Sequence, residues 1–350
     1  MKSLKLALLV LALGSGCASD DSMGSGTTAG SGGTGGTGGT GAVGGPGAVG
    51  GAAGTIAQPM GGTTGGSGGA GGVVGGTGGV GGVGGVGGVG GVGGTMDPDS
   101  GMTTGPGLLP SSDVTMDGPY ATMVDENADS GEGWLFSPTE LGANGEKHPI
   151  LVWGCGSTSM PSAYMFHLSR IASHGFVVYA SVSSSVTGAL LTRGLDWMFA
   201  QNDDANSPMY QKLDLEHVSV GGHSLGSLST YDIADDPRIT NTIHVDGGQF
   251  DGMGGQRLMK PAIFICGDDS IAKPNCDSDY MGATVPVFYT QLEGLSGLEG
   301  HIQAAREGID IWVAWMRWTL AGEEERRADF LDPSCTFCTG KYLSMHKNFP

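Results

Sequence analysis

An α/β domain, with a mostly parallel sheet and helices on both faces, is predicted by three features of the sequence. Short apolar runs rich in β-branched residues alternate with amphipathic runs through the second half of the chain. A Gly-x-Ser-x-Gly motif lies where one of the apolar runs meets an amphipathic one. A long glycine-rich segment precedes this half, so that the predicted domain follows a disordered arm.

The N-terminus has the form of an export signal. Lys2 and Lys5 precede an apolar run over 6–13, which is too short to span a bilayer as a mature helix. Residues 13–17, Leu-Gly-Ser-Gly-Cys, resemble a bacterial lipobox, with glycine where that motif usually has leucine. We therefore expect a signal peptide over 1–17 and a lipid on Cys17, which places the protein at the outer membrane or cell surface. Secretion with Cys17 unmodified or removed is the alternative.

Residues 18–108 are predicted to form a flexible linker. Gly-Gly-Thr units give way to Gly-Gly-Val units between 71 and 94, and the segment holds most of the 69 glycines of the chain. Ordering so many glycines is entropically unfavourable, and the interspersed valine and threonine offer too little apolar area to offset it. Proline is too scarce for a collagen helix. As a random coil the linker would reach about 50 Å.

The remaining residues, 109–350, are enough for one domain with a sizeable core. The net charge of −19, from 35 acidic and 16 basic residues, disfavours binding to nucleic acid or to anionic lipid. Membrane association is therefore expected only through a lipid on Cys17.

The elements of this domain follow one another in a regular order. Strands are predicted over 150–153, 176–180, 218–220, 242–245, 262–265 and 287–289. Helices are predicted over 164–172, where Gly175 can end the helix, and over 190–199, 224–233 and 309–320. In parallel sheets of this kind, chemistry gathers at the carboxyl ends of the strands. Gly154, Ser224, Asp269 and the loop after Tyr289 fall at such ends.

The motif Gly222-His223-Ser224-Leu225-Gly226 has the form of a nucleophile elbow. The turn that exposes a nucleophilic serine is so sharp that side chains two residues away would collide, which explains Gly222 and Gly226. Ser224 is the predicted nucleophile. The backbone N–H of Leu225 and that of Ser157, in the small-residue turn 154–159, are the predicted oxyanion donors.

A serine nucleophile needs a histidine base. Enzymes with this elbow follow the chain order serine, acid, histidine. Only His301 and His346 follow both Ser224 and the strand over 262–265. We choose His301, in a glycine-rich loop after the last strand, because His346 lies in a polar tail that is expected to fray. Structural or surface roles are expected of the others: His148, His167, His174, His217, His223 and His244.

The acid that orients the histidine is chosen among three aspartates. Asp269 follows a predicted strand directly and is our choice, with Asp268 beside it in reserve. Asp246 ends the preceding strand and is the third candidate. Its alternative role is that of a turn residue before two glycines.

Four segments together resemble the α/β-hydrolase superfamily, in particular its dienelactone hydrolase, cutinase and bacterial polyester hydrolase branch. They are residues 148–159, residues 172–180, the elbow and residues 267–272, and the stretch 313–316 is similar to the last helix of that family. The resemblance covers about 150–320. It implies Ser224 as nucleophile, Asp269 as acid, His301 as base, and Ser157 and Leu225 as oxyanion donors.

Two departures from that branch bear on the substrate. Its polyester hydrolases tend to carry an aromatic residue where this chain has Ser157, and more aromatic residues in the loop before the histidine. Both departures argue against specificity for aromatic polymers and leave ester hydrolysis as the expected reaction.

Five cysteines remain besides Cys17. In an exported protein, two disulfides are expected among Cys266, Cys276, Cys335 and Cys338, with the pairing left open and Cys155 as a buried thiol. Neither a metal site nor a cofactor is expected: zinc at the Cys335-x-x-Cys338 pair would need two more matching ligands, and no strand–helix unit follows the pair for redox chemistry.

The sequence thus predicts a serine hydrolase that cleaves carboxylic esters, whether small molecules or polymers, through an acyl-enzyme. The alternatives are a catalytically silent hydrolase fold that serves as a cell-surface binding module, and a lipase or peptidase of the same fold.

Overall fold

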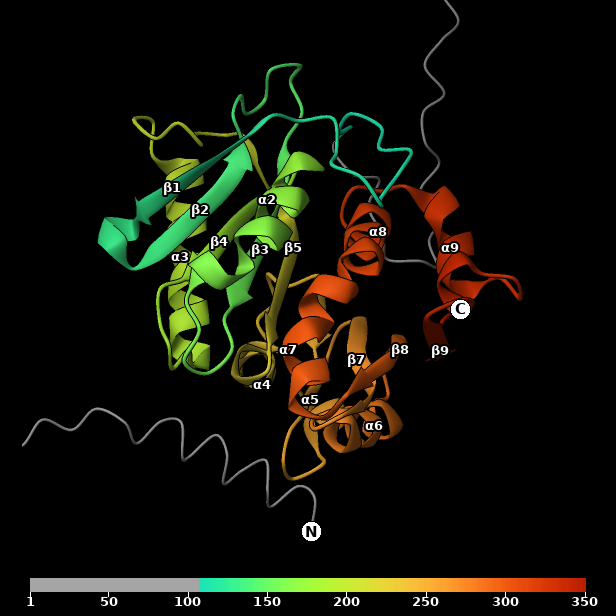
Figure 1. The fold of residues 1–350 in the computed structure, drawn as a ribbon. Coiled ribbons are helices and arrows are strands. Elements are labelled where there is room, and N and C mark those ends of the chain that lie inside the picture. The colour runs from blue at the N-terminus through green and yellow to red at the C-terminus, as the bar shows by residue number, and fades with distance from the viewer. Residues whose placement is uncertain (1–106) are drawn as a thin grey trace, which may run out of the picture. The chain divides into compact units, whose positions relative to one another are not determined.

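The computed structural model describes residues 107–350 (Figure 1). The predicted signal peptide, Cys17 and the linker up to residue 106 lie outside the described residues. Among the described residues, no helix is both long and apolar enough to cross a membrane.

A nine-stranded sheet forms the centre of the domain, in the order β1-β2-β4-β3-β5-β6-β7-β8-β9. The strands from β4 to β8 in that order run parallel, whereas β1, β2 and β9 pair antiparallel at the edges. The prediction of a mostly parallel sheet is confirmed. The strands are β1 (Thr122–Ala128), β2 (Gly133–Pro138), β3 (His148–Gly154), β4 (Val177–Ser181), β5 (Leu213–His223), β6 (Asn241–Val245), β7 (Ala262–Ser270), β8 (Val287–Ser296) and β9 (Tyr342–Lys347).

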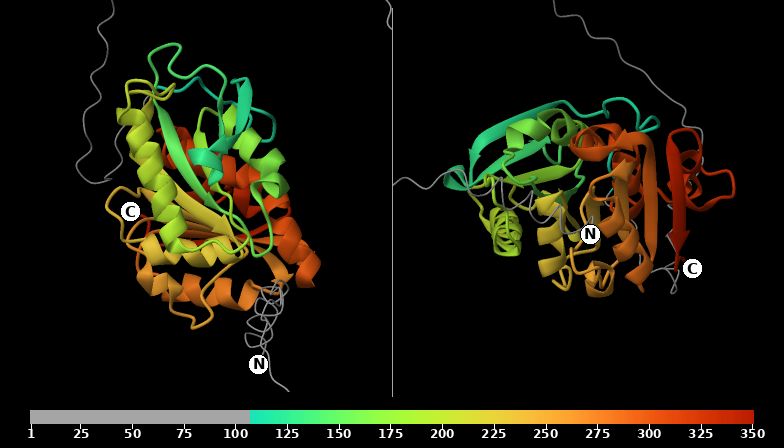
Figure 2. Two further views of the ribbon diagram at one scale, coloured as in Figure 1. Left: turned by 90° about the vertical axis from the view of Figure 1, so that its left-hand side faces the viewer. Right: turned by 60° about the horizontal axis from the view of Figure 1, so that its bottom comes forward.

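Helices cover both faces of the sheet, as predicted (Figure 2). Alternate residues of one strand enter different cores: Leu151 and Trp153 of β3 pack with α2, α7 and α8, whereas Ile150 and Val152 pack with α3. This double burial explains the continuous apolar runs. The helices are α2 (Met165–Ser173), α3 (Gly188–Asp203), α4 (Leu225–Thr230), α5 (Gly254–Arg257), α6 (Lys273–Gly282), α7 (Gly297–Glu307), α8 (Ile309–Thr319) and α9 (Arg327–Leu331).

Two expectations about the histidines are wrong. His301 lies in helix α7 and not in a loop, because the glycine-rich stretch before it forms the end of β8 and the first turn of α7. His346 lies in the edge strand β9, paired with Phe288 of β8, and not in a frayed tail.

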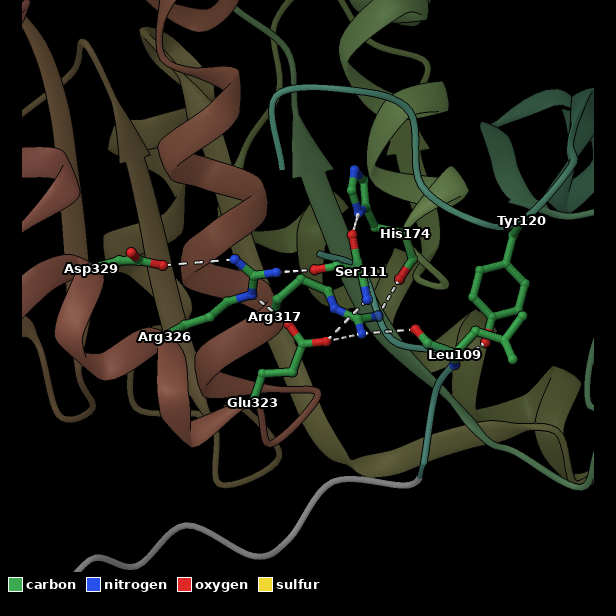
Figure 3. A network of polar contacts seen from close by, with 8 residues as sticks. All are labelled: Leu109, Ser111, Tyr120, His174, Arg317, Glu323, Arg326 and Asp329. Atoms are coloured by element: carbon green, nitrogen blue, oxygen red, sulfur yellow. Dashed lines mark hydrogen bonds and ion pairs between the residues drawn. The ribbon is translucent and has the colours of Figure 1, made fainter. Parts of the chain in front are cut away.

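A buried network of charges ties the first described segment to the end of α8 (Figure 3). The guanidinium of Arg317, only 1% exposed, donates to the backbone carbonyls of His174 at 2.8 Å and Leu109 at 2.9 Å and pairs with Glu323. Arg326 binds the same carboxylate and the carbonyl of Ser111. We call this network the N-terminal clamp: Leu109, Ser111, Tyr120, His174, Arg317, Glu323, Arg326 and Asp329.

Five buried histidines whose pKa is lowered by burial, His148 and four others, are expected to make the domain sensitive to acid. Burial lowers the pKa of His167 and His174 to about 4, and that of His223 and His244 to about 3. Each ring is therefore neutral in the folded state at pH values where the unfolded chain, with a pKa near 6.5, binds a proton.

We expect the free energy of unfolding to be fully present above about pH 6.5 and to fall as the pH drops towards 4. Each such histidine contributes a slope of about 1.4 kcal/mol per pH unit within its window. Urea unfolding followed by tryptophan fluorescence at pH 7.5, 6 and 5 measures the trend, and His174→Gln, which cannot be protonated, should make it shallower. Equal free energies of unfolding at pH 7.5 and pH 5 would contradict this expectation.

Candidate active site

A small, open cavity lies at the carboxyl ends of β5 and β6. Apolar side chains form much of its wall, and three polar side chains, those of Ser224, His301 and Asp246, converge in it. Its lining consists of Ser224, Leu225, Leu228, Asp246, Gly247, Gly248, Phe250, Ala272 and His301.

Ser224 occupies the sharp turn between β5 and α4, with a φ of 53° that non-glycine residues rarely adopt. The glycines on either side allow the backbones to meet. A Cβ built on Gly226 would lie 1.9 Å from the carbonyl oxygen of Gly154 in β3, and one on Gly222 would lie 2.2 Å from the carbonyl carbon of Gly226. The turn therefore has the shape that the elbow motif predicts, and it points Ser224 into the cavity.

A hydrogen-bonded chain runs from Ser224 through His301 to Asp246. Ser224 Oγ lies 2.9 Å from His301 Nε2, and His301 Nδ1 lies 3.0 Å from Asp246 Oδ2. Asp246 is fully buried. Its second oxygen, Oδ1, accepts from the hydroxyl of Ser270 at 2.7 Å and from the amide of Gly267 at 3.2 Å. Both carboxylate oxygens are thus engaged, which fixes the orientation of the acid towards the imidazole.

The structure does not bring Asp269 to His301, and the sequence-based choice of acid is corrected to Asp246. Asp269 is exposed within β7, opposite Ser296 of β8, and Asp268 is only half-buried. The prediction ended this strand at residue 265, whereas β7 continues to Ser270. This extension places Asp269 on the surface. In contrast, β6 ends at Val245, so Asp246 leaves the sheet beside Ser224.

Two backbone amides are placed as candidate oxyanion donors. Leu225 is the first residue of α4, where N–H groups have no intrahelical acceptor, and it lines the cavity. Ser157 is half-buried in the turn after β3 but is not one of the residues that line the cavity. Its amide has no acceptor among the described residues, whereas Thr158 donates to Ser184 and Ser159 donates to Gly156. Neither amide therefore has a hydrogen-bond acceptor within residues 107–350.

Asp279 of α6 holds the loop that carries Phe250 by hydrogen bonds to the backbone of that loop. This fully buried carboxylate accepts from the amide of Gln249 at 2.7 Å and from that of Gly254 at 2.8 Å, and burial raises its pKa. Asp279 was not singled out from the sequence, because it lies in the polar helix α6, which was not predicted. The cavity wall thus depends on a residue outside the cavity.

The structure places four cysteines in two pairs and leaves Cys155 outside them. Cys266 of β7 is bonded to Cys276 of α6, and Cys335 is bonded to Cys338. Cys155 is free and buried, and burial raises the pKa of its thiol to about 12. Asp246, Cys266 and Cys276 place their ligand atoms within 4.8 Å of one another. Since the two sulfur atoms are bonded to each other, they offer no thiolates to a metal ion.

Comparison with known proteins gives one family and two relatives. Residues 96–336 match the family model described as PETase, PET hydrolase-like. Cutinase est2 of Thermobifida alba is 26% identical over 246 residues, which are 65% of this chain and 79% of that protein. Cutinase est1 of the same organism is 25% identical over 246 residues, 65% of this chain and 80% of the relative.

Proposed function

Since the chain belongs to the PET hydrolase-like family, we propose that it is a serine esterase that hydrolyses carboxylic esters through an acyl-enzyme. One observation carries the proposal: the continuous hydrogen-bonded chain Ser224–His301–Asp246, which lies open to a largely apolar cavity. The names of the cutinase relatives support the same class of substrate.

The contacts assign each member of the chain a role. Asp246 accepts from His301 Nδ1–H and so leaves the lone pair of Nε2 facing Ser224. As Ser224 Oγ attacks the ester carbon, Nε2 takes its proton, and Asp246 stabilises the resulting imidazolium. The histidine then returns the proton to the departing alcohol. Water repeats the sequence on the acyl-enzyme and releases the acid and free Ser224.

The negative charge on the tetrahedral intermediate needs donors that are already in place. We assign this role to the N–H of Leu225 and, from the turn after β3, to that of Ser157. Leu225 reaches the carbonyl oxygen from the elbow itself, because its amide lies directly after the nucleophile. The apolar wall formed by Leu228, Phe250 and Ala272 favours an apolar acyl or alcohol group at the site.

The remaining part of the proposal concerns where the enzyme works. We assign residues 1–17 to a signal peptide, Cys17 to lipid attachment and residues 18–108 to a linker ahead of the catalytic domain, 109–350. The basis is the sequence pattern: two lysines before a short apolar run, then a cysteine, then a glycine-rich segment.

A fluorophosphonate probe tests the proposed function, because it reacts with activated serines and not with ordinary ones. We expect the wild-type chain to be labelled on the peptide that contains Ser224 and to hydrolyse p-nitrophenyl esters from acetate to octanoate. Ser224→Ala should be neither labelled nor active, at unchanged thermal stability. A folded wild-type protein without label or hydrolysis would instead indicate a binding module.

A further inference from the structure

His223 is the last residue of β5 and directly precedes Ser224; it is buried and is not one of the residues that line the cavity. Its Nδ1 is 2.8 Å from the hydroxyl oxygen of Tyr164, and its Nε2 is 2.8 Å from the backbone oxygen of His301. The same hydroxyl oxygen of Tyr164 lies 3.0 Å from the amide nitrogen of Gly156. A polar chain thus connects the turn after β3 with the backbone of the base.

The direction of every hydrogen bond in this chain is fixed. A carbonyl oxygen only accepts, so Nε2 of His223 carries the hydrogen that faces His301. In the neutral ring Nδ1 then has the lone pair and accepts from the Tyr164 hydroxyl, which in turn accepts from Gly156 N–H. Burial, with a smaller contribution from His301, lowers the pKa of His223 to about 3, which keeps the ring neutral. All donors and acceptors are satisfied in one tautomer only.

We propose that His223 and Tyr164 are positioning residues: their bridge holds the backbone of His301 in register with the turn 154–159, which presents the Ser157 amide. The inference rests on the proposed function, because it assumes that His301 is the base and that this turn serves the oxyanion. Neither side chain lines the cavity, so both act through the groups they hold.

The absence of a side chain at Gly156 leaves the space in which His223 and Tyr164 meet. A Cβ at Gly156 would lie 2.9 Å from His223 Nδ1 and 3.1 Å from the Tyr164 hydroxyl, so any larger residue would push the two partners apart. The rings of His223 and His301 also lie close, with centroids 4.9 Å apart. A shift of His223 would therefore displace both the imidazole ring and the backbone of His301. A displacement of about 1 Å in such a site lowers the rate by about 100-fold.

Removal of the single hydroxyl in Tyr164→Phe is the least disruptive test. We expect kcat for p-nitrophenyl butyrate to fall by about tenfold or more in the full-length chain, with KM little changed. The reason is that substrate contacts remain while the base and the turn lose their link. An unchanged kcat in this folded variant would overturn the proposal.

Two substitutions at His223 separate its hydrogen bond from its bulk. Gln can still donate an N–H to the His301 carbonyl, whereas Leu fills a similar volume and cannot. We expect His223→Gln to retain clearly more kcat than His223→Leu. Because both substitutions break the same bridge, the double variant Tyr164→Phe/His223→Leu should have a kcat only slightly lower than that of His223→Leu alone. Equal kcat in Gln and Leu variants, or fully additive losses, would argue for packing alone.

His174→Leu is the matched control, since it removes another buried neutral histidine, in the N-terminal clamp. It should lower the thermal unfolding temperature without lowering kcat. If His223→Leu does not fold, Tyr164→Phe decides the question.

A spectroscopic measurement tests the same bridge without reference to activity. The ¹⁵N shifts of the His223 ring should report the Nε2–H tautomer, and an Nδ1–H tautomer would overturn the inference. Failure of the proposed function leaves the wild type unlabelled and inactive. Failure of the bridge leaves an active wild type whose variants match it.

Discussion

Asp246→Asn is expected to lower kcat by about four powers of ten, the size of loss that follows when a triad histidine is held in the wrong tautomer. The amide has nearly the shape of the carboxylate, and its oxygen can still accept from Ser270 and Gly267 where Asp246 Oδ1 now does. Its NH₂ group would then face His301 Nδ1. That nitrogen would have to accept, so Nε2 would carry the hydrogen and could no longer take the proton of Ser224.

The matched control is Asp269→Asn, which changes an exposed aspartate in the neighbouring strand by the same atoms. It should keep nearly the full rate of p-nitrophenyl ester hydrolysis, and both variants should unfold at temperatures close to that of the wild type. If Asp269→Asn were the inactive variant and Asp246→Asn the active one, the assignment of the acid in this structure would be wrong.

Gly226→Ala is expected to prevent folding or to cost more than about 4 kcal/mol of stability, the range of exceptional single substitutions. The new Cβ would stand 1.9 Å from the carbonyl oxygen and 2.3 Å from the carbonyl carbon of Gly154. Both atoms belong to the backbone of the central strand β3, which is hydrogen-bonded on both sides and cannot move aside. Helix α4 cannot move away from β3 either, because Gly222 and Gly226 are already in close contact.

Soluble yield and the midpoint of thermal unfolding measure this effect. Gly282→Ala is the control, because a Cβ there would have no neighbour closer than 3.6 Å and the backbone needs no positive φ. It should behave like the wild type. A soluble Gly226→Ala protein with wild-type thermal stability would show that the elbow is not packed against β3 as described.

The central strands were predictable from the sequence because burial on both faces makes them continuous apolar runs, as in 150–153 and 262–265. The edge strands were not. β1 is mostly exposed and reads Thr-Met-Val-Asp-Glu-Asn-Ala, which carries no apolar period, and β9 pairs with β8 on one side only. Their place in the sheet is decided by long-range pairing, which a local pattern does not encode.

The choice of acid failed for a related reason. Asp246 and Asp269 each follow an apolar run that forms a strand, and both precede the histidine in the chain. What separates them is the length of β7 and the irregularity in its register with β8 between Gly267 and Asp269. The one local signal for Asp246 is the pair of glycines after it, which allows the cavity to open beside its side chain.

The N-terminal clamp makes the first described residues a necessary part of the folded domain. Arg317 and Arg326 are buried cations whose neutralisation by Glu323 is completed by the carbonyls of Leu109 and Ser111. A chain that began after Ser111 would leave both buried guanidinium groups short of acceptors. Leu109 and Ser111 are thus integral to the folded domain, because their carbonyl groups solvate the charges of two arginines some 200 residues later in the chain.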